Sequence, residues 1–122
     1  MYDIFVIMKN EVELLNGVET FLETLPQKLE AKAYWTMSLL QRMGTKLKEP
    51  YCKPVKGFNG LFELRVKQAS NIVRLFYFQH QGTMFVVTSG YVKKSQKLNR
   101  LEIEKAQRLK EKFIKEKTDG QT

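Results

Sequence analysis

The chain has 122 residues, 43% of them hydrophobic, which is enough for one core of ordinary domain size and hardly for two. No apolar run reaches the roughly 18 residues of a membrane-spanning helix, and the first residues resemble no export signal. We therefore expect neither a membrane span nor secretion. The net charge of +8 favours a polyanionic partner such as RNA, DNA or an anionic membrane surface, although a basic surface kept for solubility is the alternative.

The positive charge is concentrated in the second half of the chain. Residues 1–44 carry four cations and six acids, whereas residues 46–74 carry seven cations against two acids and residues 93–117 carry ten against four. Segregated cations bind polyanions through counterion release, so this distribution says more than the total charge.

The first half predicts a strand followed by two helices. Tyr2–Met8 is short, apolar and partly β-branched, which is typical of a buried strand. Apolar residues then recur at helical spacing in two runs, which Pro26 separates and Gly44 ends. The runs are Leu14, Val18, Phe21, Leu22 and Leu25, then Leu29, Ala33, Met37, Leu40 and Met43. We expect a helical hairpin whose apolar and aromatic side chains, Trp35 included, belong to the core.

The second half predicts a strand meander and a last helix. Residues 62–67 alternate between apolar and ionic side chains, and strands over 72–78 and 84–92 flank a turn at 79–82. Asn99 is the expected N-cap of the last helix, with Glu102 three residues later. These elements predict an α+β fold with one domain over residues 1–117 and a disordered tail over residues 118–122.

Familiar catalytic constellations are absent from the sequence. The only histidine, His80, falls in the predicted turn, where a solvated side chain is the better interpretation. The lone Cys52 cannot form an intramolecular disulfide, which predicts a free thiol and a reducing, cytoplasmic compartment. No metal site, catalytic triad or phosphate loop has the required spacing, so we expect no cofactor. Arginine, lysine and tyrosine remain as candidates for chemistry.

The arginines and lysines of the meander can converge. Arg65 and Arg74 lie on neighbouring predicted strands, and Lys93 and Lys94 lie where the next strand leaves the sheet. Guanidinium groups bind phosphate in bidentate fashion and can stabilise the charge of a pentacovalent phosphorus. An ion pair between Arg65 and a carboxylate such as Glu63, with lysines that merely solvate a strand end, explains the spacing equally well.

Residues 44–110 also contain an ordered set of short motifs. They are Gly44-Thr45, Lys48-Glu49-Pro50-Tyr51, Leu61-Phe62-Glu63-Leu64-Arg65, Arg74-Leu75-Phe76-Tyr77, Gly90-Tyr91-Val92-Lys93-Lys94-Ser95-Gln96-Lys97 and Glu102-Ile103-Glu104-Lys105-Ala106. In this order the motifs resemble the phage-derived, HigB-like branch of the RelE/ParE toxins. Two departures are Ser89, where relatives often have histidine, and Leu98-Asn99, where they have Thr-Pro.

The resemblance implies a RelE-like antiparallel sheet with an N-terminal helical hairpin packed on it and a C-terminal helix. It also implies a toxin of a type II toxin–antitoxin system, a metal-independent endoribonuclease that cuts mRNA on the ribosome and is silenced by an antitoxin, often a HigA-like protein with a helix-turn-helix. Carried over by motif, the catalytic residues are Arg65, Arg74, Lys93 and Lys94. Residues expected to bind RNA are Lys46, Lys48, Lys53, Lys56, Tyr77, Tyr91 and Lys97, of which the two tyrosines could stack on a base or donate a proton.

Two other functions fit the same sequence. One is a non-catalytic inhibitor that binds a protein such as gyrase, as ParE relatives do, because fold alone does not separate the two activities. The other is an inactive nucleic-acid-binding relative, since Ser89 replaces the usual histidine and leaves the general base open.

Overall fold

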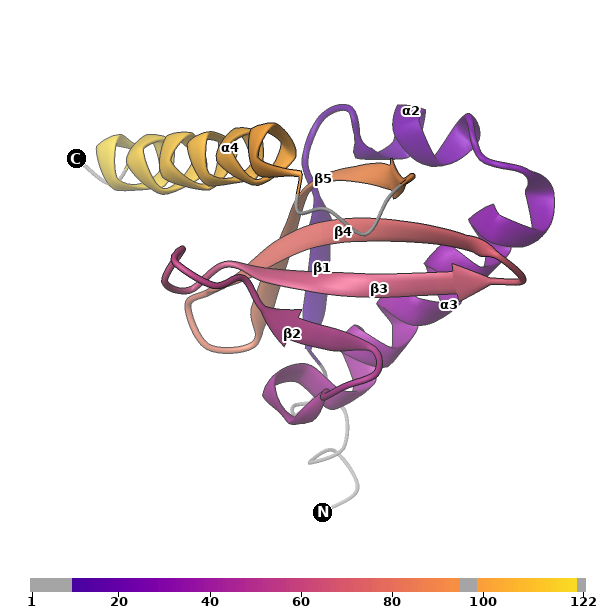
Figure 1. Ribbon diagram of the computed structural model, residues 1–122. Helices are drawn as coiled ribbons and strands as arrows, with labels where there is room; N and C mark the ends of the chain where they lie inside the picture. The colour runs from indigo at the N-terminus through magenta and orange to yellow at the C-terminus, as the bar shows by residue number, and fades with distance from the viewer. Residues whose placement is uncertain (1–9, 95–98, 121–122) are drawn as a thin grey trace, which may run out of the picture.

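The computed structural model describes residues 10–94 and 99–120, which form one five-stranded sheet with helices on both faces (Figure 1). The strand order is β1-β5-β4-β3-β2. The strands are β1 (Glu11–Leu14), β2 (Cys52–Pro54), β3 (Phe62–Gln68), β4 (Asn71–His80) and β5 (Met84–Lys93). The helices are α2 (Val18–Glu23), α3 (Gln27–Met43), the short 3-10 helix η1 (Gly44–Lys46) and α4 (Arg100–Asp119). The α+β class is confirmed.

The sheet is antiparallel except at one edge, where β1 pairs in parallel with β5. This edge corrects two expectations: the sheet is not wholly antiparallel, and Leu14 belongs to a strand rather than to a helix. Pairing with β5 continues through Leu15, whose N–H donates to the Val87 carbonyl at 3.0 Å, so the first helix starts only after Gly17. The predicted strand Tyr2–Met8 lies outside the described residues.

The helical hairpin α2–α3 covers one face of the sheet and forms the larger core. Leu29, Ala33, Met37 and Leu40 of α3 are buried as predicted. They pack with the apolar side chains of β3, β4 and β5, namely Leu64, Val66, Val73, Leu75, Tyr77, Phe85 and Val87. Two helix residues assigned to the core are instead exposed, Trp35 at 42% and Met43 at 45%. That correction matters for the surface described below.

Helix α4 covers only part of the other face. Asn99 caps it as predicted, since its side chain accepts a hydrogen bond from the Glu102 N–H at 3.2 Å. Ile103 and Ala106 of α4 pack on Phe76, and Phe113 packs on Phe78. The helix continues through Asp119, past the predicted end of the domain at residue 117, and Figure 1 shows it extending beyond the sheet. No helix of the described residues is both long and apolar enough to span a membrane.

Two further details of the strands differ from expectation. Residues 52–54, for which the sequence predicted no strand, form edge strand β2 by pairing with β3. His80 belongs to β4, opposite Met84, rather than to the turn. Its ring is perpendicular to that of Phe113, with centroids 5.0 Å apart, so it is half-buried against α4 instead of solvated.

Candidate functional site

The candidate site is the part of the second sheet face that α4 leaves open. Register places Arg65 of β3 directly opposite Arg74 of β4, and Arg74 directly opposite Tyr91 of β5. Directly paired residues of antiparallel strands share a face, so these side chains form one row across the sheet. Lys93 of β5 lies two residues beyond Tyr91 on that face. The predicted convergence of Arg65, Arg74 and Lys93 on one surface therefore follows from the register.

Glu63 pairs with Arg74, not with Arg65. The Arg74 guanidinium donates to Glu63 Oε1, and the two residues are only 6% and 4% exposed. Lys53 Nζ of β2 is 3.8 Å from the same carboxylate oxygen. Arg74 Nε is also buried, and within the described residues it has no hydrogen-bond partner. The pair thus holds Arg74 in place, with one of its donors buried and unpartnered among the described residues.

Arg65 is exposed and borders a cavity of about 360 Å³. Glu63, Arg74 and Lys53 line the cavity with it, together with Glu49, Pro50 and Cys52 of the segment that leads into β2. Three cations therefore face two carboxylates, one of which is already engaged with Arg74. This balance favours an anionic ligand, and a guanidinium can bind phosphate through two parallel hydrogen bonds.

Electrostatics at the site shift two pKa values in opposite directions. Burial and then the neighbouring positive charge of Arg74 lower the pKa of Lys93, with smaller contributions from Arg65 and Lys53. Burial raises the pKa of Tyr91, whose ring stacks on Phe76 with centroids 5.9 Å apart. At neutral pH Tyr91 therefore keeps its proton, whereas Lys93 loses its proton more readily than an isolated lysine does.

The structure does not bring every predicted residue to this surface. Tyr77 faces the opposite core, 4% exposed between Phe62 and Phe85, and its hydroxyl contacts the Cys52 thiol. Burial prevents Tyr77 from stacking on a base, so we withdraw it from the site. Four predicted lysines remain exposed without lining the cavity, namely Lys46, Lys48, Lys56 and Lys94. Lys97 lies outside the described residues.

A second cavity, of about 230 Å³, lies on the other side of Pro50 and Arg65. Its lining is Lys32, Thr36, Pro50, Tyr51, Arg65 and Lys67. Sequence reasoning missed the helix residues here because it assigned α3 to the core. A signal was available: Trp35 lies two residues from both Ala33 and Met37, and that spacing places it off their shared helix face.

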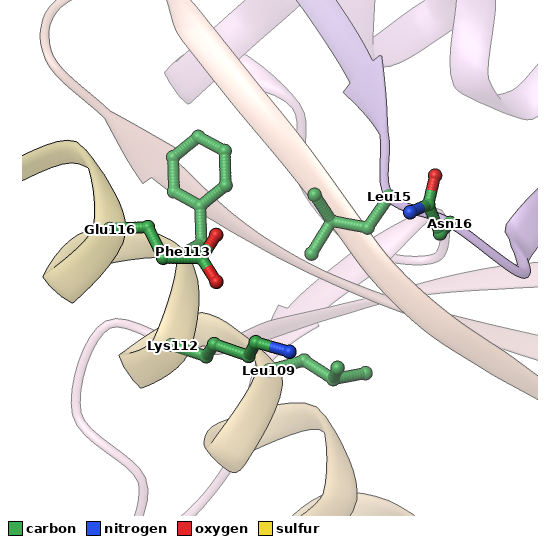
Figure 2. Close-up of a pocket in the computed structure, with 6 residues that line it drawn as sticks. All are labelled: Leu15, Asn16, Leu109, Lys112, Phe113 and Glu116. Carbon is green, nitrogen blue, oxygen red and sulfur yellow. The ribbon is translucent and has the colours of Figure 1, made fainter. Parts of the chain in front are cut away.

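A third cavity, also about 230 Å³, lies between α4 and the segment that follows β1. Figure 2 shows Leu109, Lys112, Phe113 and Glu116 of α4 on one side and Leu15 and Asn16 on the other. The charges of Lys112 and Glu116 cancel, so this third cavity lacks the excess of cations that the first two cavities have. In residues 10–94 and 99–120, no three His, Cys, Asp or Glu side chains are grouped as a metal site requires.

Residues 20–111 match the family described as "Phage derived protein Gp49-like (DUF891)". The chain belongs to this family. The match spans the helical hairpin, the meander and most of α4, and so includes every residue of the candidate site. Among curated proteins, none matches the chain.

Solved structures of similar fold come from RelE-type systems. The RelBE2 toxin–antitoxin complex of Mycobacterium tuberculosis contains a chain with 20% identity and a TM-score of 0.53, over 70% of this Gp49-like chain and 100% of that one. The archaeal RelE–RelB complex of Pyrococcus horikoshii contains a chain with 15% identity and a TM-score of 0.54, over 75% of this chain and 100% of that one. A mutant of the E. coli toxin RelE in the free state has 14% identity and a TM-score of 0.52, over 73% of this chain and 86% of that one. These similarities confirm the RelE-like fold.

Proposed function

We propose that this Gp49-like protein is the toxin of a type II toxin–antitoxin pair and an endoribonuclease that cuts translated mRNA on the ribosome. The observation that carries the proposal is the cavity in which exposed Arg65 lies beside buried Arg74 and Lys53. The RelE-like fold supports it, because toxins are among the solved proteins of that fold. Ribosomal alignment of the RNA would account for weak activity on free RNA, which we also expect.

The chemistry is attack of a ribose 2′-oxygen on the adjacent phosphorus. The P–O bond to the next nucleotide's 5′-oxygen breaks, which leaves a 2′,3′-cyclic phosphate and a 5′-hydroxyl. Negative charge builds on the phosphoryl oxygens, and Arg65 and the buried Arg74 are the groups that stabilise it. The unpartnered Nε of Arg74 is the kind of donor that a phosphate oxygen satisfies.

Two proton transfers complete the reaction. The attacking 2′-oxygen gives up a proton, and Lys93 is the candidate base because its lowered pKa increases the neutral fraction. The departing 5′-oxygen needs a proton, and Tyr91 is the candidate donor because its phenol is protonated at neutral pH and it lies directly opposite Arg74 in the sheet. Lys94, exposed just after β5, is the alternative base. This division of roles needs no histidine at Ser89.

The partner that silences the toxin is, on this proposal, a HigA-like antitoxin with a helix-turn-helix. Two of the solved proteins of this fold were crystallised as complexes of a toxin with its antitoxin. A chain of net charge +8 suits an acidic partner segment, whose association would be steered by charge and slowed by added salt.

Mapping of mRNA 5′ ends after brief induction tests the function. The parent should create new 5′ ends within translated messages, and Arg65→Ala should reduce their formation about a hundredfold, since a group that stabilises developing charge is removed. Arg108→Ala, which removes an exposed arginine of α4, is the matched control and should cut as the parent does.

Two outcomes would contradict the proposal. A folded Arg65→Ala variant that cuts as well as the parent would place the active site elsewhere. Growth inhibition by the parent with every message intact would instead favour the inhibitor that binds a protein target such as gyrase.

A further inference from the structure

The second cavity carries cations but no carboxylate. Lys32 of α3 and Arg65 and Lys67 of β3 contribute its charges, and Thr36, Pro50 and Tyr51 complete its lining. Arg65 and Pro50 also line the first cavity, so the two hollows adjoin. A ligand that extends from the candidate active site past Arg65 would enter this second cavity.

Two aromatic rings are exposed at the same place. Trp35 is 42% and Tyr51 37% exposed, and their rings meet edge to face with centroids 6.0 Å apart. Lys32 Nζ lies 4.3 Å from the centre of the Trp35 ring. Large apolar rings left in water beside cations are typical of binding surfaces, because neither ring contributes its full burial energy to the fold.

The spacing of the cations suits an extended strand. Arg65 and Lys67 are two residues apart on one strand, so their side chains share a face and their backbones are separated by about 7 Å. Lys32 approaches from α3. Cations in a line beside aromatic rings are the arrangement that proteins use for single-stranded nucleic acid, with phosphates on the cations and bases on the rings.

We propose that this second cavity is a subsite for the nucleotide that flanks the scissile phosphate of a single-stranded RNA. Its base stacks on Tyr51, which lines the cavity and whose ring meets the neighbouring Trp35 ring edge to face, and its phosphate contacts Lys67 and Lys32. The inference rests on the proposed endoribonuclease function and adds to it how the RNA is positioned. An acidic protein segment is disfavoured as the occupant because the two exposed aromatic rings offer nothing specific to a carboxylate.

The single tryptophan of the chain gives a direct readout. The probe is a short single-stranded RNA with 2′-O-methyl groups, which cannot be cut, and its partner probe is the same strand with abasic sites. Binding is followed by anisotropy of a label on the strand and by Trp35 fluorescence. We expect the intact strand to quench Trp35 and the abasic strand to quench it much less while still binding.

Variants separate stacking from charge. Tyr51→Ala should weaken binding of the intact strand about tenfold, and Tyr51→Phe should restore it, since stacking needs only the ring. Lys67→Ala should weaken both strands alike and reduce the slope of affinity against salt by about one. Tyr34→Ala, an equally exposed aromatic next to Trp35 that does not line the cavity, is the matched control and should bind as the parent does.

Unchanged Trp35 fluorescence at saturating RNA, or parental binding by Tyr51→Ala, would overturn the subsite. Quenching by an acidic peptide but not by RNA would overturn it in favour of a protein-docking face. Because the probe cannot be cut, the result is independent of catalysis. If the proposed function is wrong but the subsite is right, mRNA in cells stays intact while RNA still quenches Trp35. If the subsite is wrong but the function is right, mRNA is cleaved while RNA leaves Trp35 fluorescence unchanged.

Discussion

The buried pair of Glu63 and Arg74 shows how one side chain can serve both the fold and the site. Both residues are almost fully inaccessible, yet both line the cavity at Arg65. A buried ion pair contributes little net stability, but removal of one partner leaves a charge without compensation. Arg74 is therefore a poor target for a simple test of catalysis, and Arg65 is a good one because it is exposed.

Glu63→Ala should destabilise the protein by about 3 kcal/mol or more, because the Arg74 charge stays buried alone. Replacement of both residues, Glu63→Leu with Arg74→Met, should recover most of that loss, since no charge remains to be desolvated. Urea unfolding measures both values. If the single and the double variant are destabilised equally, the uncompensated charge of Arg74 is not the cause of the lost stability.

Lys93 should titrate below an ordinary lysine, and its neighbours should shift its pKa in opposite directions. Arg65→Ala removes a positive charge that disfavours the ammonium form, so the Lys93 pKa should rise. Glu63→Gln removes a negative charge that favours that form, so the pKa should fall. Side-chain NMR titration of the lysine amines measures both shifts. If Lys93 is the base, the alkaline rise in cleavage rate should move to higher pH in Arg65→Ala; shifts of the same sign in both variants would exclude this origin.

At the level of elements, the site exists because α4 covers the sheet incompletely. Its buried residues Ile103, Ala106 and Phe113 reach only the portion of the second face that carries Phe76 and Phe78. The helix does not cover the remaining portion, where exposed Arg65 lies beside buried Arg74. The apolar spacing along α4 thus sets the border of the candidate site.

Helix α2 on the opposite face depends on Gly90 of β5. A Cβ built on Gly90 would lie 2.5 Å from Leu75 Cδ2, 2.9 Å from Phe21 Cε2 and 3.1 Å from the Arg74 carbonyl oxygen. Gly90→Ala should therefore cost about 1–3 kcal/mol of stability through overpacking. Thermal unfolding checks the loss, and Phe21→Leu in the same chain should recover part of it. Undiminished stability of Gly90→Ala would show that α2 can shift freely.

The meander was predictable from sequence because its signal is local. Alternation of apolar and ionic residues over 62–67 and the short turns that follow place Arg65 and Arg74 on adjacent strands, and the structure agrees. Strands β1 and β2 were missed because each has four residues or fewer, and β1 is in addition held by a partner distant in sequence. Such pairing leaves no periodic trace of its own.

The finer features of the site were not predictable for a related reason. Glu63 lies on the face that carries both arginines, so spacing alone could not decide which of them it pairs with; burial of Arg74 decides it. The prediction that Tyr77 binds RNA was wrong. Arg74, Phe76 and Phe78 alternate along β4 and share one face, so Tyr77 lies on the opposite face.

On the scale of the whole molecule, the two halves of the sequence take different roles. The acidic first half supplies the helical layer under the sheet, and the basic second half supplies the meander and α4. The candidate active site lies entirely after residue 48, whereas the proposed flanking subsite takes Lys32 and Thr36, and the Trp35 ring beside Tyr51, from α3. Recognition of RNA would thus depend on contact between the two layers.

The single cysteine gives the molecule a built-in reporter of local opening. Cys52 is 7% exposed in the three-residue edge strand β2, its thiol donates to the Leu47 carbonyl at 3.2 Å, and burial raises its pKa. Alkylation of the folded protein should therefore be slow, and its rate should report how often the structure opens locally around Cys52. Because Cys52 also borders the cavity at Arg65, an occupant that holds the edge strand in place will protect the thiol without any engineered label.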